Sequence, residues 1–384
     1  IDYLSGIQKD PGYSVLPVQI TTEENKPNQI VAFVEFVYSG TPAEEKGLKR
    51  GDIIYRIDGK KLNTDNYSQL LSQDKFTITL GKINSNGEIE EEESNKISLE
   101  ARELNLNPIV ETSIIDTAGH KIGYLAYASF ISDYDVALAD TIEYFKNEGV
   151  TDFVLDLRYN DGGAIASARK LSEMLVPDDN EGDTFIKEEY NDLITEMLKE
   201  RNDWTTDSFQ INFRNPEDIE DVNTRLDIDQ LHVLTTSTTA SASEMIIYGL
   251  GPYMDVVQIG GKTHGKYYGS NTFSEEDKHS WAIQPIIVRL AGANDDLDYY
   301  EGLSPDHPLE DINSLAKSDQ LGEAGELFLA KAISDITGEP FPYEEDDLKS
   351  LERLKSGIEQ NTQELKKKLD PWYGKMWTTI PEMK

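Results

Sequence analysis

Residues 153–163 read FVLDLRYNDGG, and this stretch decides the fold. Its first five residues form a short apolar run, typical of a strand buried on both faces. Gly162 and Gly163 then provide a turn, and residues 164–175 follow with helical apolar spacing. A buried strand that passes through a turn into a helix predicts a crossover unit and an α/β fold.

The alternation of strands and helices extends to both sides of this stretch. It predicts strands over 122–127, 231–234, 255–259 and 281–289. It predicts helices over 134–147, 244–250 and 321–336. We therefore expect an α/β core with a mixed, largely parallel sheet.

The N-terminal part of the chain has a different pattern. Runs rich in β-branched and aromatic residues alternate with turns, and the clearest run is 30–38, IVAFVEFVY. Asp58-Gly59 is a strong tight-turn signal. Further strands are expected over 53–57, 76–83 and 96–101, with a Glu-rich hairpin tip over 84–95. This pattern predicts a small, separate α+β domain.

The length of 384 residues allows more than one core. We expect a first domain over 1–110, the α/β core over 111–340, and a charged, helical extension over 341–384. The segment near 178–229 is acidic and weakly patterned, with a helix over 191–201 as its clearest element. We interpret this segment as an insertion in the core.

The charge of the chain restricts its partners. Acidic residues outnumber basic ones by 72 to 36, so the formal net charge is −36, which repels nucleic-acid phosphates and anionic lipids. Cysteine is absent, which excludes disulfides and thiolate chemistry. No apolar run approaches the ~18 residues of a membrane-spanning helix. The chain begins with Ile1 and no leader, and we interpret it as a mature fragment whose export signal has been removed.

Ser241 and Lys266 are the candidate catalytic pair. A serine hydroxyl becomes a nucleophile when a base removes its proton, and a buried lysine can be that base because desolvation disfavours the ammonium. Ser241 lies in TTASASE, residues 238–244, which also fits a capping box with Glu244. A structural helix cap is therefore the alternative for Ser241, and His264 is an alternative base.

Backbone N–H groups near the serine are candidates for an oxyanion hole. A serine that begins a helix lies where free N–H groups favour negative charge. Ala242 is the candidate donor there, and Gly162 or Gly163 is the candidate donor from the other turn. The acidic run 294–298 (NDDLD) lacks the spacing of a calcium loop, so we interpret it as a solvated turn and expect no metal or cofactor.

Together these segments resemble the C-terminal processing peptidases, which use a Ser-Lys dyad. Residues 240–244 resemble the nucleophile motif, Gly265-Lys266 the lysine motif, 156–163 the oxyanion segment, and 302–306 (GLSPD) a fourth motif. The resemblance implies a ClpP/crotonase-like protease core. In that core Ser241 is the nucleophile, and Lys266 is the base of a serine endopeptidase that needs no cofactor.

Residues 40–59 resemble a PDZ domain, which commonly precedes this protease core. Such a domain implies binding of an extended polypeptide, notably a C-terminal tail, by strand addition. Residues 12–15 (GYSV) are the candidate carboxylate loop, with Gly12 and Tyr13 as candidate peptide-binding residues. The family usually works in the bacterial envelope, so the resemblance implies an extracytoplasmic location, in the periplasm or cell envelope. The sequence indicates no oligomeric state.

Two positions depart from the family pattern. Many members carry Gln four residues after the lysine, where this chain has Ser270, and others carry Asp where this chain has Pro252. Ser270 is therefore the candidate partner of Lys266. The departures also motivate an alternative function, a catalytically weak or inactive peptide-binding scaffold of the same fold.

Overall fold

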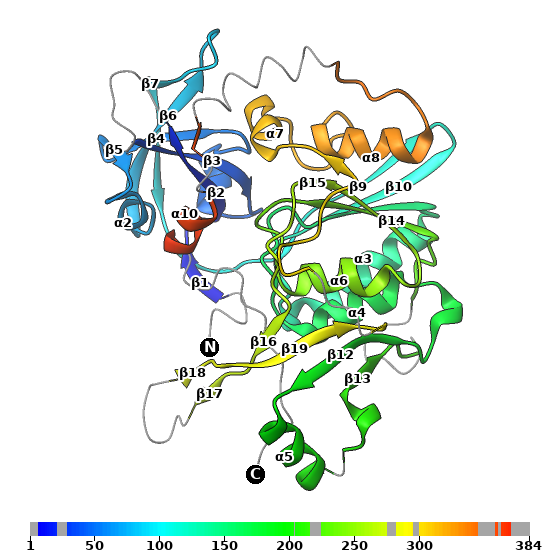
Figure 1. Cartoon of the computed structure of the whole chain (residues 1–384). Helices are drawn as coiled ribbons and strands as arrows, with labels where there is room; N and C mark the ends of the chain where they lie inside the picture. Colours follow the sequence, from blue (N-terminus) through cyan, green and yellow to red (C-terminus); the bar gives the residue numbers. More distant parts are fainter. Residues whose placement is uncertain are drawn as a thin grey trace. The chain divides into compact units, whose positions relative to one another are not determined.

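The computed structural model describes residues 7–20, 29–202, 204–215, 224–274, 282–294, 299–344, 358–359 and 362–369. The chain divides into two compact units. Ile1–Ser113 and Leu309–Tyr373 form the first unit, and Ile114–Pro308 and Gly374–Lys384 form the second. Each unit is described by itself (Figure 1).

The second unit contains a six-stranded sheet. Its strand order is β20 (His307–Pro308), β15 (Asp255–Gly260), β14 (Gln230–Thr235), β11 (Asp152–Asp156), β10 (His120–Tyr127) and β9 (Ile109–Thr117). The pairings from β10 through β20 are all parallel. The predicted α/β fold with a mixed, largely parallel sheet is confirmed. The fully buried side chains of β11 and β14 explain the apolar runs that predicted them.

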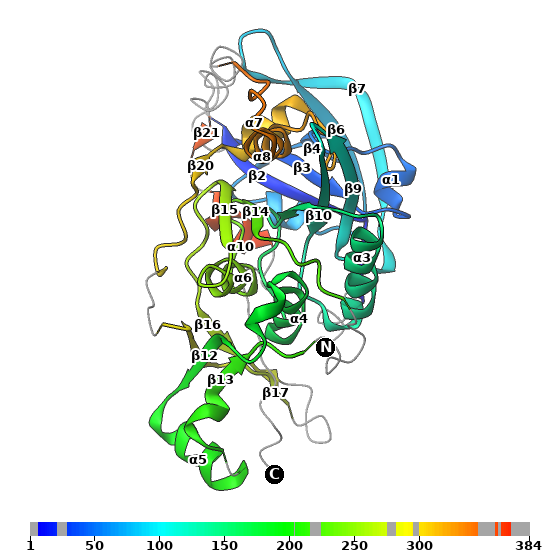
Figure 2. The ribbon, with the colours of Figure 1, turned by 90° about the vertical axis from the view of Figure 1, so that its right-hand side faces the viewer.

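Three helices cover one face of this sheet (Figure 2). They are α3 (Asp135–Asn147), α4 (Ile165–Leu175) and α6 (Ala242–Leu250). Each follows a parallel strand through a short turn, as the crossover pattern predicted. The turns that lead into α4 and α6 therefore lie at the carboxyl ends of neighbouring strands, β11 and β14. Ligands of open α/β sheets usually bind at such ends.

The acidic segment near 178–229 is more regular than its sequence indicated. It supplies β12 (Thr184–Tyr190), β13 (Gln210–Asn212) and α5 (Asp192–Asn202). These strands join β19 (Ile286–Gly292) and β16 (Tyr268–Ser270) in a four-stranded sheet. The expected strand over 281–289 is thus β19, which begins and ends later than the sequence predicted. The acidic side chains of β12 hid the strand, because Glu189 pairs with Arg289 of β19 instead of facing a core.

The first unit is built on a seven-stranded sheet. Its order is β21 (Ile358–Glu359), β2 (Tyr13–Ile20), β3 (Gln29–Val37), β5 (Lys60–Asn63), β4 (Ile53–Ile57), β6 (Lys75–Ile83) and β7 (Ile89–Glu100). Apolar clusters pack on both faces of the sheet. The expected polar hairpin tip over 84–95 is wrong, because β7 already begins at Ile89. There Glu90 pairs in register with Lys82 of β6, so polar side chains carry the strand.

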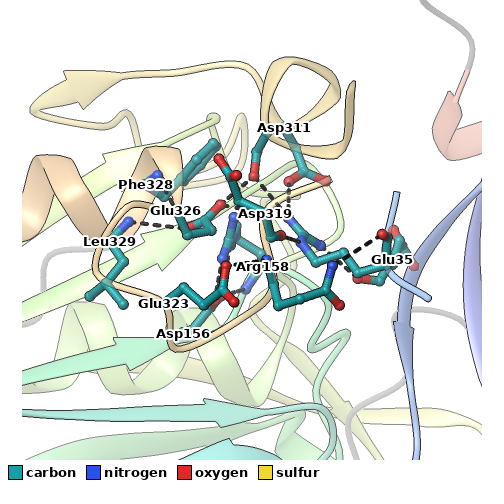
Figure 3. Close-up of polar contacts among 12 residues, drawn as sticks. Glu35, Asp156, Arg158, Asp311, Asp319, Glu323, Glu326, Phe328 and Leu329 are labelled. Atoms are coloured by element: carbon teal, nitrogen blue, oxygen red, sulfur yellow. Dashed lines mark hydrogen bonds and ion pairs between the residues drawn. The ribbon is translucent and has the colours of Figure 1, made fainter. Parts of the chain in front are cut away.

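The helix expected over 321–336 also starts later. Two helices occupy this part of the first unit, α7 (Asp311–Lys317) and α8 (Leu327–Thr337). The Glu326 carboxylate caps α8 by accepting the N–H groups of Phe328 and Leu329, which fixes the start of the helix (Figure 3). The buried Arg50 guanidinium lies 3.6 Å from the Glu326 carboxylate and donates to the carbonyl of Glu35 on β3. This buried cation links α7 and α8 to the sheet.

Candidate active site

Ser241 occupies a strained turn between β14 and α6. Its φ is 65° and its ψ is −116°, a backbone conformation that residues other than glycine rarely adopt. Its side chain is fully buried, and its Oγ forms no hydrogen bond of standard geometry with any residue that the structure describes. A strained strand-to-helix turn is also where serine nucleophiles of hydrolases are found. The same turn forms a capping box, in which the Ser241 side chain faces the Glu244 N–H, so the helix-cap alternative also holds.

The Glu244 carboxylate ties the Ser241 turn to the Lys266 segment. It accepts the backbone N–H of Ser241 at 2.8 Å and that of Lys266 at 2.8 Å. It also accepts the N–H of Gly265 and the hydroxyl of Thr263, both at 2.6 Å. Four donors therefore converge on one fully buried side chain. The two halves of the predicted dyad are brought together through their backbones by this residue.

Burial of Glu244 has an electrostatic consequence. Desolvation raises the pKa of its carboxyl above the ordinary value, although the four hydrogen bonds oppose the rise. The buried Tyr299 phenol shares this environment, and both burial and the Glu244 charge raise its pKa. The carboxylate is thus held in a dry setting, where its hydrogen bonds are strong.

The Lys266 segment is constrained on both sides. Gly265 has φ 89°, and a Cβ there would lie 2.2 Å from the Tyr300 carbonyl oxygen, so only glycine fits. The His264 N–H donates to the Thr239 carbonyl at 3.0 Å. Lys266 itself is half-buried, and the ring of Tyr267 stacks against Tyr268 with centroids 4.5 Å apart. The segment is an ordered turn, in agreement with the prediction from its glycine and aromatic neighbours.

The double-glycine turn lies directly against Ser241. A Cβ added to Gly162 would lie 2.7 Å from the Cβ of Ser241 and 3.0 Å from its Oγ. Gly163 has φ 136°, and a Cβ there would lie 2.3 Å from the carbonyl oxygen of Phe130. Both positions require glycine because of close approach and positive φ. The turn after β11 and the turn after β14 therefore form one cluster.

Asn160 distinguishes the two glycines. Its Oδ1 accepts the N–H of Gly162 at 2.9 Å, while its Nδ2 donates to the Tyr127 carbonyl at 2.9 Å. The N–H groups of Gly163 and Ala242 have no hydrogen-bond partner within the described ranges. Ala242 is the first residue of α6, whose N–H has no partner inside the helix. Of the three candidate oxyanion donors, Ala242 and Gly163 are the two whose N–H groups are not already bonded to another described residue, and both residues are buried.

Threonine hydroxyls join the two turns below the site. Thr236 donates to the carbonyl of Arg158, and Thr239 donates to that of Leu157 at 2.7 Å. Arg158 is itself fully buried and forms a bidentate pair with Asp156 at the end of β11 (Figure 3). These contacts fix the turns from which the candidate groups project.

The sequence missed two residues that organise this site. Glu244 was interpreted only as part of a capping box, and Asn160 was not singled out. The signal for Glu244 was the TTASASE stretch itself, because its third helical residue can reach back to the serine N–H. Ser270 lies in β16, where it is buried and pairs with Ile286. Its predicted role beside Lys266 stays a prediction.

The candidate peptide loop lies in the first unit, at the start of β2. Gly12 has φ 93°, and its N–H donates to the Asp10 carboxylate at 2.6 Å. Burial raises the pKa of the Tyr13 phenol. An internal carboxylate thus occupies one of the amides that were expected to bind a tail.

Other predicted features give no further site. The acidic run 294–298 lies outside the described residues except for Asn294. In the described part of the chain, no three His, Asp or Glu side chains gather as metal ligands would. Over the same residues, no helix is both long and apolar enough to cross a bilayer.

Comparison with known proteins identifies two domains. Residues 121–306 match the model of Peptidase family S41, and residues 33–80 match that of a PDZ domain. A Bacteroides fragilis protein assigned to the S41 proteases has a solved structure that covers 86% of this chain and 83% of its own. Its sequence identity is 27% and the TM-score is 0.71. The predicted resemblance and the order of the two domains are confirmed.

Curated relatives are more distant. The carboxyl-terminal-processing protease of Synechocystis sp. is 24% identical over 249 residues, which are 64% of this chain and 52% of the relative. The carboxy-terminal processing protease CtpA of Bacillus subtilis is 22% identical over 266 residues, 69% of this chain and 50% of the relative. The chain thus spans about half the length of the curated relatives that it matches.

Proposed function

Since the chain contains a Peptidase family S41 domain preceded by a PDZ domain, we propose that it is a serine endopeptidase that cleaves polypeptides. The observation that carries the proposal is the Glu244 carboxylate, which hydrogen-bonds the backbones of both Ser241 and Lys266. A residue that joins these two segments supports a Ser-Lys dyad more strongly than either motif alone.

In the proposed mechanism, the neutral Lys266 amine takes the proton from the Ser241 hydroxyl as Oγ attacks the scissile carbonyl carbon. The tetrahedral oxyanion binds the N–H groups of Ala242 and Gly163. Lys266 then returns the proton to the leaving amine as the C–N bond breaks, and water hydrolyses the acyl-serine by the same route. Activity is expected to rise toward alkaline pH, because the base must be neutral.

Cleavage of an unfolded polypeptide tests this mechanism. Ser241→Ala should abolish cleavage, which is followed by gel electrophoresis and by mass spectrometry of the products. The matched control is Ser243→Ala, which keeps the helix start and removes a hydroxyl that donates to the Asn160 carbonyl. Full cleavage by the Ser241→Ala protein would disprove the mechanism.

We also propose that the PDZ domain binds an extended polypeptide, such as a C-terminal tail, at the edge of its sheet. Binding of a free-acid peptide and of the same peptide with an amidated C-terminus shows whether the domain recognises the terminal carboxylate. Weaker binding of the amidated peptide supports this recognition, and equal binding of the two peptides excludes it. An extracytoplasmic location belongs to the same proposal, and fractionation of cells that produce the protein from its natural gene tests it.

The inactive scaffold is the second candidate function. The full burial of the Ser241 side chain favours it, because a substrate carbonyl cannot reach this hydroxyl without movement of the turns. Binding of peptides by a protein that neither cleaves them nor reacts with serine-directed probes would establish the scaffold. Cleavage that depends on Ser241 would exclude it.

A further inference from the structure

The chain itself pairs with one end of the β2 edge of the PDZ sheet. β21 (Ile358–Glu359) pairs with β2, with Ile358 opposite Ile20 and Glu359 opposite Gln19. Without β21, β2 would be the edge strand of the sheet. An added peptide strand takes this position in recognition by strand addition.

β21 points toward the start of β2, where the Gly12–Tyr13 loop lies. β21 runs antiparallel to β2, and α10 (Thr362–Leu369) follows it and contacts both β2 and α2 (Tyr67–Leu71). Lys366 of α10 reaches Glu35, whose carboxylate also accepts the hydroxyl of Ser14 near the start of β2. The segment therefore runs in the direction that a tail would take to end at the predicted carboxylate loop.

Specific contacts hold α10 in place. Leu365 is buried in the core cluster that includes Val15 and Tyr67. The Tyr67 hydroxyl donates to the Leu365 carbonyl at 2.7 Å, and the Ser68 hydroxyl donates to the Lys368 carbonyl at 2.9 Å. A buried leucine and two hydrogen bonds from side-chain hydroxyls to helix carbonyls thus fix α10 against α2 and β2.

A buried ion pair between Lys366 of α10 and Glu35 of β3 determines which side chain can occupy this position. The Lys366 Nζ lies 2.6 Å from the Glu35 carboxylate, and the two side chains are 10% and 1% exposed. Removal of Lys366 would leave a buried carboxylate without its cation, which is strongly unfavourable. Any peptide that replaces the segment must therefore bring its own cation beside an apolar residue.

The carboxylate loop is occupied as well. The Asp10 carboxylate accepts the N–H of Gly12, which a terminal carboxylate would otherwise use. A second anion at this loop would meet the Asp10 charge at short range. One end of the strand edge, the apolar position and the Gly12 amide are thus occupied from within one unit of the chain.

We propose that the peptide site of this PDZ domain holds the chain's own β21 and α10, residues 358–359 and 362–369. An outside polypeptide then binds only after this segment has left, and it must carry a basic residue next to an apolar one. This inference rests on the proposed peptide-binding role of the β2 edge and adds an internal competitor to it. A tethered segment competes at an effective concentration of about 1 mM, so weak tails are excluded.

Binding of a labelled peptide tests the proposal. The probe is a fluorescent peptide with the sequence of residues 356–371, and every protein carries Ser241→Ala so that cleavage plays no part. The release variant is Leu365→Asp/Lys366→Glu, and its control is Lys367→Glu on the exposed side of α10. We expect the release variant to bind at least about tenfold more tightly than the parent and the control, because its site is vacant.

Further variants and measurements distinguish self-occupation of the site from failure of tail recognition. Glu35→Gln added to the release variant should weaken probe binding, because the buried carboxylate selects the lysine. Equal probe affinity of parent and release variant would overturn the proposal. If the release variant binds the probe but no other tail, the self-occupied site stands and tail recognition fails. If the release variant does not fold, amide hydrogen exchange of the parent protein tests the proposal instead. Rapid exchange of the amides of Gln19–Ile20 would also overturn the proposal.

Discussion

The Ser241 cluster and the Gly12 loop both place a carboxylate beside backbone amides, but the carboxylate accepts different amides in the two places. Each has an acidic side chain, a glycine with positive φ and nearby backbone amides; Glu244 is fully buried and Asp10 is half-buried. At the Ser241 cluster, Glu244 binds the turns together from behind and leaves the N–H groups of Ala242 and Gly163 open. At the Gly12 loop, Asp10 accepts the Gly12 N–H, one of the amides that were expected to bind a tail. The difference lies in which amides the carboxylate accepts: Glu244 leaves the candidate ligand-binding amides unbonded, whereas Asp10 occupies one of them.

The largest effect is expected from loss of the proposed catalytic base in the Ser241 cluster. Lys266→Met removes the proposed base and should lower kcat/KM for an unfolded polypeptide by about 10³-fold or more, as loss of a catalytic-set member does. The exposed Lys262 is the matched control, and Lys262→Met should retain the rate. A Lys266→Met protein with the parent rate would show that another group acts as base.

The next effect removes the link between the turns. Glu244→Gln can accept hydrogen bonds on one oxygen only, so its amide group faces two of the four donors. Each buried donor left unpaired costs about 1–3 kcal/mol, and urea unfolding should show a loss of about 3 kcal/mol. Glu143→Gln, on the exposed face of α3, should change the unfolding free energy little. Equal stability of the two variants would contradict the role of Glu244.

Asn160 gives a smaller effect at the same cluster. Asn160→Ala loses the bonds to Gly162 and Tyr127, so we expect a loss of about 2 kcal/mol in unfolding free energy and a lower kcat. The exposed Asn147 at the end of α3 provides the control, Asn147→Ala. Unchanged kcat in Asn160→Ala would mean that the Gly162 turn needs no such anchor.

The pH dependence of stability reports on Glu244. Its pKa is raised by burial above 4.5, so the folded state keeps a proton that the unfolded state releases. Its contribution to stability is complete below pH 4.5 and falls as the pH rises through the raised value. The stability advantage of the parent over Glu244→Gln should therefore narrow from acidic toward neutral pH. If urea unfolding shows that the stability difference between the parent and Glu244→Gln widens with pH, the pKa of Glu244 is lowered in the folded state, not raised.

The smallest effect is expected from removal of the Asp10 carboxylate at the Gly12 loop. In the release variant, Asp10→Ala frees the amide of Gly12, and we expect free-acid peptides to gain a few-fold in affinity over amidated ones. Fluorescence anisotropy with the two forms of one peptide measures this preference. If Asp10→Ala changes both forms equally, the loop amides do not read a terminal carboxylate.

Sequence patterns predicted the parts of this molecule where burial alone decides the structure. The strands β11 and β14 were visible because both faces are covered, which leaves a continuous apolar run. β12 was not, because its acidic side chains are paired across the sheet with β19. The edge contact of β21 with β2 was also invisible, since a two-residue pairing has no periodic signal.

The candidate site divides in the same way. Ser241, Lys266 and the double glycine were found because their residue types are chemically distinctive and stand in order along the chain. Glu244 and Asn160 act through backbone amides of residues distant in sequence, and no local pattern records those partners. The capping-box interpretation is confirmed, since Glu244 accepts the Ser241 N–H and the Ser241 side chain faces the Glu244 N–H. The same carboxylate also holds the lysine segment.

The most direct test of the central claim is covalent labelling of Ser241. The protein is treated with a fluorophosphonate, and the labelled residue is identified by peptide mass spectrometry in the parent, in Lys266→Met and in Lys262→Met. Our account predicts a label on Ser241 in the parent and in Lys262→Met, and its loss in Lys266→Met. Labelling of Ser241 that is equally fast in Lys266→Met, or no label on Ser241 in any protein, would contradict a Ser241–Lys266 dyad.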